Sequence, residues 1–241
     1  MAAAPLPPIS QSPTDRVEAA VKTLEQAVRE HSPVTYSCSL GLEGVVLADL
    51  IWTRFPEIDV FTLDTGRLHE ETRLLLERLE IRYKRSMRVV YPEASDLENY
   101  VAQHGMNGFY KGLDQRKTCC FVRKVAPFRR AIEGKGAWVT GVRRSQSESR
   151  AAGSEIAWDS EYSLYKVSPL LDWTDADIWN YVRSHRVPYN TLHDRGFTSI
   201  GCAPCTRAIQ PGEQPRAGRW WWEQIETREC GLQGRIRAAT A

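Results

Sequence analysis

The sequence predicts an α/β fold with a doubly wound, mostly parallel sheet. Short segments rich in β-branched and aromatic residues alternate along the chain with segments that carry apolar residues at helical spacing. Loops rich in Gly, Ser and Asp separate them, and strands that alternate with helices in this way form parallel sheets covered on both faces. A chain of 241 residues buries a sizeable core, so the fold needs no disulfides.

The first half of the chain contains the strand–loop–helix units. Four prolines in residues 1–13 predict a flexible arm. A helix is then expected to begin at Thr14, a good N-cap, and to end before Ser32-Pro33. The elements expected next are, in order, a strand over 34–39, a turn over 40–44, a helix over 45–51, a strand over 58–63, a loop over 64–67, a helix over 68–79 and a strand near 87–90.

The second half contains fewer clear elements. A strand is expected over 137–140, and a helix after Thr174, because Thr174 and Asp177 have the spacing of a capping box. From residue 206 on, the sequence is rich in turn residues and ends in a polar segment. The expected organisation is therefore an α/β domain over 14–205 and a C-terminal tail over 206–241.

A basic stretch over 116–150 stands out from a nearly neutral chain. The whole chain has 32 Lys and Arg against 30 Asp and Glu, whereas this stretch has ten basic and two acidic residues. A solvated surface, a nucleic-acid site and a site for a small polyanionic ligand are all compatible with such a charge. The chain has no run of about 20 apolar residues that would span a membrane, and its first residues lack the pattern of a signal peptide. A cytoplasmic protein is expected.

Open α/β sheets bind ligands at the carboxyl ends of their strands, where the strand order reverses. The loops expected at this place are 37–44, 64–67 and 141–150. The first is rich in glycine and hydroxyl residues and precedes a helix N-terminus, where backbone N–H groups bind anions. A simple tight turn is the other interpretation. The loop has neither the Walker pattern nor Gly-x-Gly-x-x-Gly, so the common NTPase and dinucleotide sites are disfavoured.

The cysteines give the strongest functional signal. Cys119-Cys120 and Cys202-Ala-Pro-Cys205 form two pairs whose thiolates can meet at one metal centre. Zinc and a cubane iron–sulfur cluster both take four thiolates. Adjacent cysteines point in different directions, which suits a cluster of several iron atoms better than one zinc ion; buried structural or redox thiols are the remaining alternative. Cys38 lies in an expected strand and is interpreted as a small core residue.

Cys230 stands apart in the polar tail. A thiol in such a tail is a candidate nucleophile, because exposure and neighbouring cations such as Arg228 favour its thiolate form. An incidental thiol is the alternative. The histidines are scattered and no Ser-His-Asp arrangement is evident, so thiol chemistry is the best-supported option.

A series of segments from about residue 36 to 232 matches one family in order. The segments are Ser37-Cys-Ser-Leu-Gly41, Thr62-Leu-Asp-Thr-Gly-Arg-Leu68, Arg116-Lys-Thr-Cys-Cys120, Trp138-Val-Thr-Gly-Val-Arg143, Val187-Pro-Tyr-Asn190, Ser199-Ile-Gly-Cys-Ala-Pro-Cys-Thr-Arg207, Arg216-Ala-Gly-Arg-Trp-Trp-Trp-Glu223 and Glu229-Cys-Gly-Leu232. In this series the chain resembles the assimilatory adenylyl-sulfate (APS) reductases of bacteria and plants.

The resemblance implies a fold of the adenine-nucleotide alpha-hydrolase-like type, with Cys230 as the nucleophile. It also implies a [4Fe–4S] cluster held by Cys119, Cys120, Cys202 and Cys205. In the two-step reaction of the family, the tail thiolate attacks the sulfur of APS and expels AMP. Thioredoxin or glutaredoxin then releases sulfite from the Cys S-sulfonate. Such an enzyme serves sulfate assimilation and cysteine biosynthesis; family members form homo-oligomers, and neither nucleic acid nor a membrane is an expected partner.

The resemblance implies substrate contacts as well. The residues implied for the adenosine part are Ser37, Ser39, Leu63 and Gly141, the last two through their backbone. Those implied for the phosphosulfate are Arg143, Arg150, Arg216 and Arg219. Forked guanidinium donors suit phosphate and sulfate groups. Lys124 matches a lysine between the cluster and the substrate, where a cation screens an anionic cluster from a polyanion.

The chain departs from the family pattern in two places. Leu42 and Gly44 replace the alanine and the second acid of a Ser-Leu-Gly-Ala-Glu-Asp loop, and Gln233 replaces a histidine of the tail. The family's contacts at these positions are therefore not carried over. The alternative functions are a reductase for 3′-phosphoadenylyl sulfate (PAPS), or for both substrates, and a non-catalytic cluster- or zinc-binding nucleotide sensor. PAPS reductases usually lack the two cysteine pairs, so APS is the favoured substrate.

Overall fold

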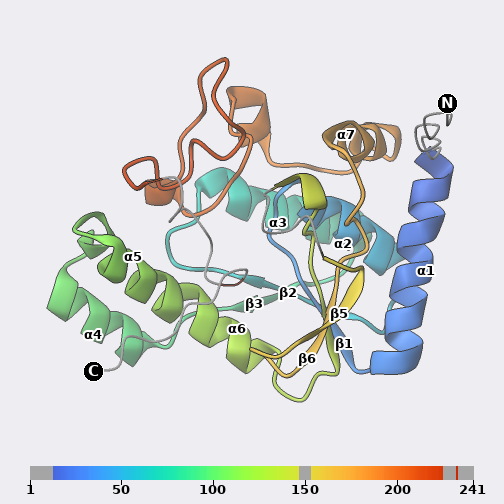
Figure 1. The fold of residues 1–241 in the computed structure, drawn as a ribbon, viewed down its shortest axis with the longest axis horizontal. Helices are drawn as coiled ribbons and strands as arrows, with labels where there is room; N and C mark the ends of the chain where they lie inside the picture. Colours follow the sequence, from blue (N-terminus) through green and yellow to red (C-terminus); the bar gives the residue numbers. More distant parts are fainter. Residues whose placement is uncertain (1–12, 147–152, 225–231, 233–241) are drawn as a thin grey trace, which may run out of the picture.

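The computed structural model describes residues 13–146, 153–224 and 232. Within these ranges the strands form one sheet with the order β3-β2-β1-β4-β6-β5 (Figure 1). The strands are β1 (Val34–Ser37), β2 (Asp59–Leu63), β3 (Arg88–Val90), β4 (Ala137–Val139), β5 (Ile156–Asp159) and β6 (Leu164–Val167). Neighbouring strands pair in parallel from β3 to β6, and β5 runs antiparallel to β6 at one edge. The mostly parallel sheet predicted from the sequence is confirmed.

Helices follow the strands as expected and also occupy much of the basic stretch. They are α1 (Pro13–His31), α2 (Leu42–Arg54), α3 (Glu70–Tyr83), α4 (Ala94–His104), α5 (Leu113–Cys120), α6 (Ala126–Ala131) and α7 (Asp175–Ser184). The predicted capping box of α7 is confirmed: the Asp177 N–H donates to Thr174 Oγ1 at 3.2 Å, and the Thr174 N–H donates to the Asp177 carboxylate at 2.8 Å. None of these helices is both long and apolar enough to cross a membrane. Residues 1–12 of the expected arm lie outside the described ranges.

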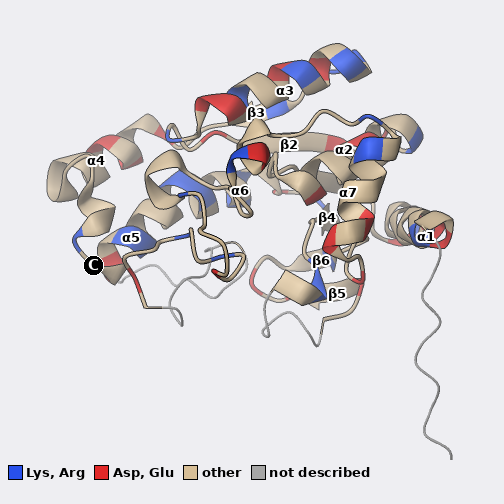
Figure 2. Ribbon diagram, turned by 90° about the horizontal axis from the view of Figure 1, so that it is seen from above, with Lys and Arg blue, Asp and Glu red and all other residues tan. Residues whose placement is uncertain are grey.

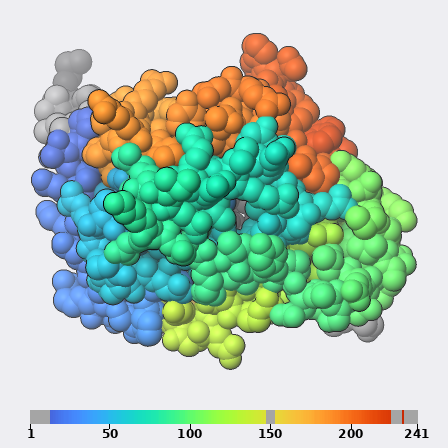
Figure 3. Space-filling model, turned by 180° about the vertical axis from the view of Figure 1, so that it is seen from behind, coloured from blue at the N-terminus to red at the C-terminus, as the bar shows by residue number. Residues whose placement is uncertain are grey.

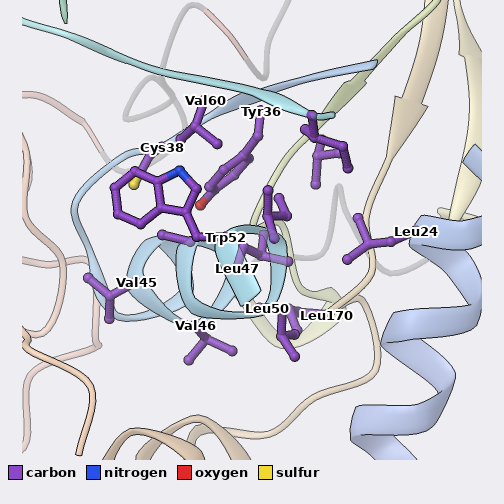
Figure 4. Packing of buried hydrophobic residues seen from close by; sticks show 14 of the residues in the cluster. Leu24, Tyr36, Cys38, Val45, Val46, Leu47, Leu50, Trp52, Val60 and Leu170 are labelled. Atoms are coloured by element: carbon purple, nitrogen blue, oxygen red, sulfur yellow. The ribbon is translucent and has the colours of Figure 1, made fainter. Parts of the chain in front are cut away.

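Helices cover both faces of the sheet. A large apolar cluster joins α1, α2, α3 and α7 to one face, and Figure 4 shows part of it, with Leu24 reaching in from α1. A smaller cluster packs Phe128 of α6 against Phe61 and Trp138 on the other face. Val60 and Phe61 are neighbours in β2 but belong to different clusters, because successive side chains of a strand point to opposite faces. Burial on both faces explains why these strands are apolar throughout.

The strand order reverses beside β1, which fixes where a ligand site is expected. β2 and β3 lie on one side of β1, whereas β4 and β6 lie on the other. The loops after β1, β2 and β4 therefore leave the sheet at the same edge, the place where open α/β sheets bind ligands. In Figure 1 the orange-to-red stretch up to residue 224 lies above α5 and beside α3, and Figure 3 shows it bordering the teal residues of α3.

A buried carboxylate ties three helices together on one face. Asp49 of α2 is 6% exposed and accepts a hydrogen bond from the Tyr181 hydroxyl of α7 at 2.5 Å. The Tyr83 hydroxyl at the end of α3 donates to its other oxygen. A buried carboxylate is tolerated only when donors replace the water that it has lost. The two tyrosines therefore hold α2, α3 and α7 in register, and α2 and α3 carry the loops after β1 and β2.

Tyr181→Phe is expected to lower the free energy of unfolding by about 2 kcal/mol, because it removes one donor from a buried charge. Urea unfolding followed by circular dichroism measures this loss. Tyr189→Phe is the matched control, since the Tyr189 hydroxyl donates to Asp194 at the surface, 3.0 Å away, and its loss should cost about 0.5 kcal/mol. Equal losses in the two variants would contradict the role of the Asp49 network.

Candidate active site

One continuous helical stretch carries the first cysteine pair. Cys119 and Cys120 end α5, and a π-helical turn, η2 (Phe121–Val125), leads directly into α6. Such turns are rare and occur frequently at functional sites. Arg123 of this turn is buried, and its guanidinium donates to the Thr65 carbonyl in the loop after β2, with an N···O distance of 2.6 Å. The contact fixes the first cysteine pair at the carboxyl edge of the sheet.

The second cysteine pair reaches the same edge by pairing with the same loop. Cys202 forms an antiparallel bridge with Leu68, and the Ala203 N–H donates to the Arg67 carbonyl at 2.7 Å. The Thr65 hydroxyl oxygen lies 3.2 Å from Cys202 Sγ. The loop after β2, expected to serve a ligand, therefore also positions this pair.

The two cysteine pairs line one cavity, called the cysteine cavity below, with a volume of about 30 Å³. One water molecule needs about 10–15 Å³ on the same measure, so the space holds more than one atom. The lining residues are Arg67, Phe109, Arg116, Cys119, Cys120, Arg123, Lys124, Cys202, Pro204, Cys205, Arg219 and Trp220. None of these four cysteines forms a disulfide bond. Across the described ranges, no group of three or more Cys, His, Asp or Glu side chains is placed so that it could hold a metal ion.

Positive charge surrounds these thiols. Five of the lining residues are Lys or Arg, and Figure 2 shows blue basic positions on α5, the helix that ends in the first cysteine pair. Burial raises the pKa of Cys205 well above its usual value. The negative charges of the other three cysteines raise the same pKa further, whereas the positive charge of Arg219 lowers it. Burial likewise raises the pKa of Cys119, and Arg123 opposes this shift. Thiolates in this cavity therefore need compensating positive charge.

Arg219 forms part of the cavity wall, where its guanidinium stacks on Trp220 and donates to a main-chain carbonyl. Its guanidinium carbon lies 4.5 Å from the centre of the Trp220 ring, and Nη1 donates to the Ile200 carbonyl at 3.2 Å. A Cβ on Gly201 would lie 2.3 Å from Arg219 Nη2, so a side chain at residue 201 would displace this guanidinium from its present position. Arg219 Nε is buried and has no hydrogen-bond partner in the described part of the chain. A forked cation with an unused donor at this place suits an anionic ligand.

The residues expected to hold adenosine also lie at the carboxyl edge. Ser37 ends β1, Leu63 ends β2, and Gly141 comes just after β4. A Cβ on Gly141 would lie 2.8 Å from Glu43 Cβ, so the loop after β4 passes close to the start of α2. Ser39 is exposed in the loop between β1 and α2. These four expected residues are therefore brought to one edge of the sheet.

Gly44, in the first turn of α2, packs closely against the loop after β1. The Gly44 carbonyl accepts a hydrogen bond from the buried Tyr36 hydroxyl at 2.8 Å. A Cβ at this position would lie 2.9 Å from Ser39 Oγ, so a larger residue requires Ser39 to move. With an acid at residue 44, as in the family loop, the Ser39 hydroxyl would have to move from its present position.

Each of the three guanidinium nitrogens of Arg143 donates a hydrogen bond to a protein group. Its Nε donates to Glu43 at 2.8 Å, Nη2 to Asp175 at 2.5 Å, and Nη1 to the Trp173 carbonyl at 3.2 Å. Burial lowers the pKa of Arg143, but the two carboxylates raise it above its ordinary value. A phosphosulfate at this guanidinium would have to compete with both carboxylates. The substrate role expected for Arg143 stays a prediction.

The remaining expected residues fall into two groups. Lys124 lines the cysteine cavity, and the Arg216 carbonyl accepts a hydrogen bond from the Arg219 N–H at 2.9 Å, so both lie in or next to its wall. Arg150 and Cys230 lie outside the described residues. Sequence reasoning did not single out Arg67 or Arg116 as site residues. Helical spacing gives a signal for Arg116, since it lies three and four residues before the first cysteine pair.

Cys38 is a core residue, as expected, and it does not line the cysteine cavity. It is 2% exposed in the cluster of Tyr36 and Trp52 (Figure 4), and burial raises its pKa to about 11. At pH 8 about one such thiol in a thousand is ionised, because pH lies three units below the pKa.

We expect Cys38 to resist iodoacetamide in the native protein at pH 8, because alkylation requires the thiolate. Peptide mass spectrometry after a timed reaction measures this. The same thiol in urea should react fully, since unfolding returns its pKa to the ordinary range. Equal alkylation rates in native and unfolded protein would contradict the burial of this thiol.

The chain is similar to named reductases over most of its length. A family model described as the phosphoadenosine phosphosulfate reductase domain matches residues 33–208. An adenosine 5′-phosphosulfate reductase of Allochromatium vinosum is 47% identical over 220 residues, which cover 91% of this chain and 86% of that protein. A protein of the same name from Sinorhizobium fredii strain NGR234 is 50% identical over 197 residues, covering 82% of this chain and 78% of that protein.

Solved structures show the same architecture. A phosphoadenylyl-sulfate reductase from Candida auris, in a phosphate complex, superposes with a TM-score of 0.68 at 25% identity and covers 83% of this chain and 99% of that chain. An NH3-dependent NAD synthetase from Campylobacter jejuni gives a TM-score of 0.54 at 11% identity, covering 79% and 80% of the two chains, which is a likeness of fold only. The expected adenine-nucleotide alpha-hydrolase-like fold is confirmed.

Proposed function

Because this chain belongs to the phosphoadenosine phosphosulfate reductase family, we propose that it reduces adenylyl sulfate (APS) to sulfite and AMP in sulfate assimilation. The observation that carries the proposal is the cysteine cavity, where four cysteine thiols and five Lys or Arg side chains meet at the carboxyl edge of the sheet, the edge at which open α/β sheets bind ligands. The relatives at 47% and 50% identity are named adenosine 5′-phosphosulfate reductases, which supports APS as the substrate.

The proposed nucleophile is Cys230. Its thiolate attacks the sulfur of the APS sulfonyl group, so that a bond forms between the two sulfur atoms. The bond between that sulfur and the bridging phosphate oxygen breaks, and its electron pair leaves with AMP. A covalent Cys S-sulfonate divides one difficult reduction into two easier steps.

Thioredoxin or glutaredoxin is the proposed electron donor. One of its thiolates attacks Cys230, and sulfite leaves with the electron pair of the bond between the two sulfur atoms. The second thiol of the donor then resolves the mixed disulfide, so that the donor leaves oxidised and Cys230 is regenerated. The enzyme is proposed to act in the cytoplasm, where such donors are kept reduced.

A [4Fe–4S] cluster is the proposed occupant of the cysteine cavity. The proposed ligands are Cys119, Cys120, Cys202 and Cys205. All four proposed ligands are sulfur atoms, as in iron–sulfur proteins. They come from two separate segments that line one cavity, and this arrangement would suit a cluster of several iron atoms better than a single metal ion. Such a cluster supplies a fixed negative charge beside the substrate. Lys124 lines the same cavity and is proposed to screen that charge from the polyanionic substrate.

Arg219 is the described arginine best placed to hold the phosphosulfate, because it is buried at the cavity wall with an unused donor. Arg216 and Arg150 are proposed to assist it. Arg143 is proposed to reach the substrate by releasing Asp175, whose side chain is 80% exposed, while Glu43 keeps its place. The proposed contacts of the adenosine part are Ser37, Ser39, Leu63 and Gly141.

PAPS is the second candidate substrate, alone or with APS. The observation that favours it is Gly44, which removes an acid from the loop after β1 and so lowers the repulsion that a further phosphate group would meet. The family model and the Candida auris structure are both described as reductases of this nucleotide.

We expect the anaerobically purified protein to gain one sulfonate when it is mixed with APS in the absence of a thiol donor. Intact-mass spectrometry measures the adduct. Cys230→Ser should gain none, whereas Cys38→Ser, the control for loss of a thiol elsewhere, should gain one. An adduct with PAPS but not with APS would establish the second candidate, and no adduct with either nucleotide would refute both.

Arg219→Lys is expected to weaken APS binding about tenfold, because a lysine keeps the charge but loses the forked donors and the stacking on Trp220. Equilibrium titration in a Cys230→Ser background measures the affinity without turnover. Arg207→Lys is the matched control, since Arg207 lies on the same segment but pairs with Glu213 away from the cavity. An unchanged affinity for Arg219→Lys would remove this residue from the substrate site.

A further inference from the structure

A nearly dry ion pair joins α5, which ends in the first cysteine pair, to the segment around Trp220. Arg116 of α5 donates from Nε and Nη2 to the two carboxylate oxygens of Glu223, each at 2.9 Å. The side chains of the pair are 1% and 7% exposed. A bidentate pair with this burial has a defined geometry and is costly to break, unlike a surface pair. It connects residues 107 positions apart in the sequence.

Further contacts fix the same short segment to the cavity. The Trp220 N–H donates to the Cys205 carbonyl at 3.1 Å, and the Glu223 N–H donates to the Trp220 carbonyl at 2.8 Å. The Arg116 guanidinium carbon lies 4.9 Å from the centre of the Trp220 ring, which also stacks with Arg219. Residues 220–223 are therefore tied to both cysteine-bearing segments.

Arg116 links the first cysteine pair to the segment that leads to Cys230. It lies one helical turn before Cys119 and Cys120, and it lines the cysteine cavity with its guanidinium directed to Glu223. Cys230 follows Glu223 by only seven residues. Seven residues span at most about 25 Å, so Glu223 limits the region that the Cys230 thiol can reach. Leu232, two residues beyond Cys230, limits it from the other side, because it packs against the cluster of Phe61 and Phe128.

We propose that the Arg116–Glu223 pair is an anchor of the C-terminal nucleophile: it fixes the chain at Glu223, seven residues before Cys230, and so helps to position the thiol for attack on bound substrate. Both residues are positioning residues, because they act through Cys230. Confining a reactive group near its target raises its effective concentration, and loosening the attachment lowers the rate of attack without changing substrate affinity. The kinetic part of this inference rests on the proposed function.

The test compares Glu223→Gln with Glu213→Gln in the full chain. Glu213 makes a similar bidentate pair with Arg207, at 2.7 and 2.8 Å, but that pair is 30–35% exposed and does not line the cavity. Three quantities are measured: amide hydrogen exchange in the peptide around residues 219–224, the rate of S-sulfonate formation on mixing with APS, and the affinity for APS in a Cys230→Ser background.

Glu223→Gln should speed exchange in that peptide and slow S-sulfonate formation at least fivefold, with the affinity for APS unchanged within twofold. Glu213→Gln should match the unmutated protein in all three. Arg116→Lys, which keeps the charge but loses the forked donors, should reproduce the changes of Glu223→Gln and serves if that variant does not fold.

Unchanged exchange in Glu223→Gln would overturn the anchor. Faster exchange with an unchanged S-sulfonation rate would reduce the pair to a structural contact, and a loss of affinity equal to the loss of rate would assign it to substrate binding; either result overturns the proposal. Absence of any adduct with APS in the unmutated protein would refute APS reduction instead, and the exchange measurement would still decide whether the pair fixes the segment.

Discussion

The main-chain bridge between Leu68 and Cys202 is the contact on which the arrangement of the cysteine cavity depends. It attaches a segment from late in the chain to the loop after β2, and Arg123 attaches the first cysteine pair to the same loop through the Thr65 carbonyl. One loop therefore sets the relative position of both pairs. That loop is in turn fixed by the parallel pairing of β2 with β1 and β3, so the sheet determines where the four thiols meet.

Charge balance explains the arginine-rich surroundings of this cavity. A buried thiolate or phosphosulfate destabilises the fold unless cations lie beside it, and a buried guanidinium group does so unless anions lie beside it. The anionic and cationic groups of this cavity therefore stabilise one another. The basic stretch of the sequence divides accordingly. Arg116, Arg123 and Lys124 line the cavity, whereas Arg129 and Arg130 make exposed pairs with acids at the surface. The solvated-surface interpretation of this stretch thus holds for Arg129 and Arg130, whereas Arg116, Arg123 and Lys124 line the cavity where a ligand is proposed.

The parts of the fold that the sequence predicted are those that hydrophobic burial determines. β1 and β2 are apolar because both faces are covered, and the capping box of α7 depends on two nearby residues. Helix α5 escaped prediction because its buried positions are Arg116 and Cys119, so it has no apolar stripe to detect. β5 escaped because it is a short edge strand with a partly exposed face.

The same distinction holds for the site. The cysteine pairs are recognisable in the sequence because their residue type and spacing are local, whereas Arg219 was expected only from the resemblance to a known family. The pairing of Arg143 with Glu43 and Asp175, and of Arg116 with Glu223, joins residues from about thirty to more than a hundred positions apart, so the chain must fold before these partners can be recognised.

The proposed chemistry depends above all on the two cysteine pairs meeting to hold one iron–sulfur cluster beside the substrate site. The most direct test is the iron, acid-labile sulfide and zinc content of the anaerobically purified protein, combined with its Mössbauer spectrum. We expect about four iron and four sulfide per chain with the spectrum of a single cubane cluster. One zinc per chain without sulfide, or iron retained in full when Cys202 is replaced by serine, would contradict the proposed cluster.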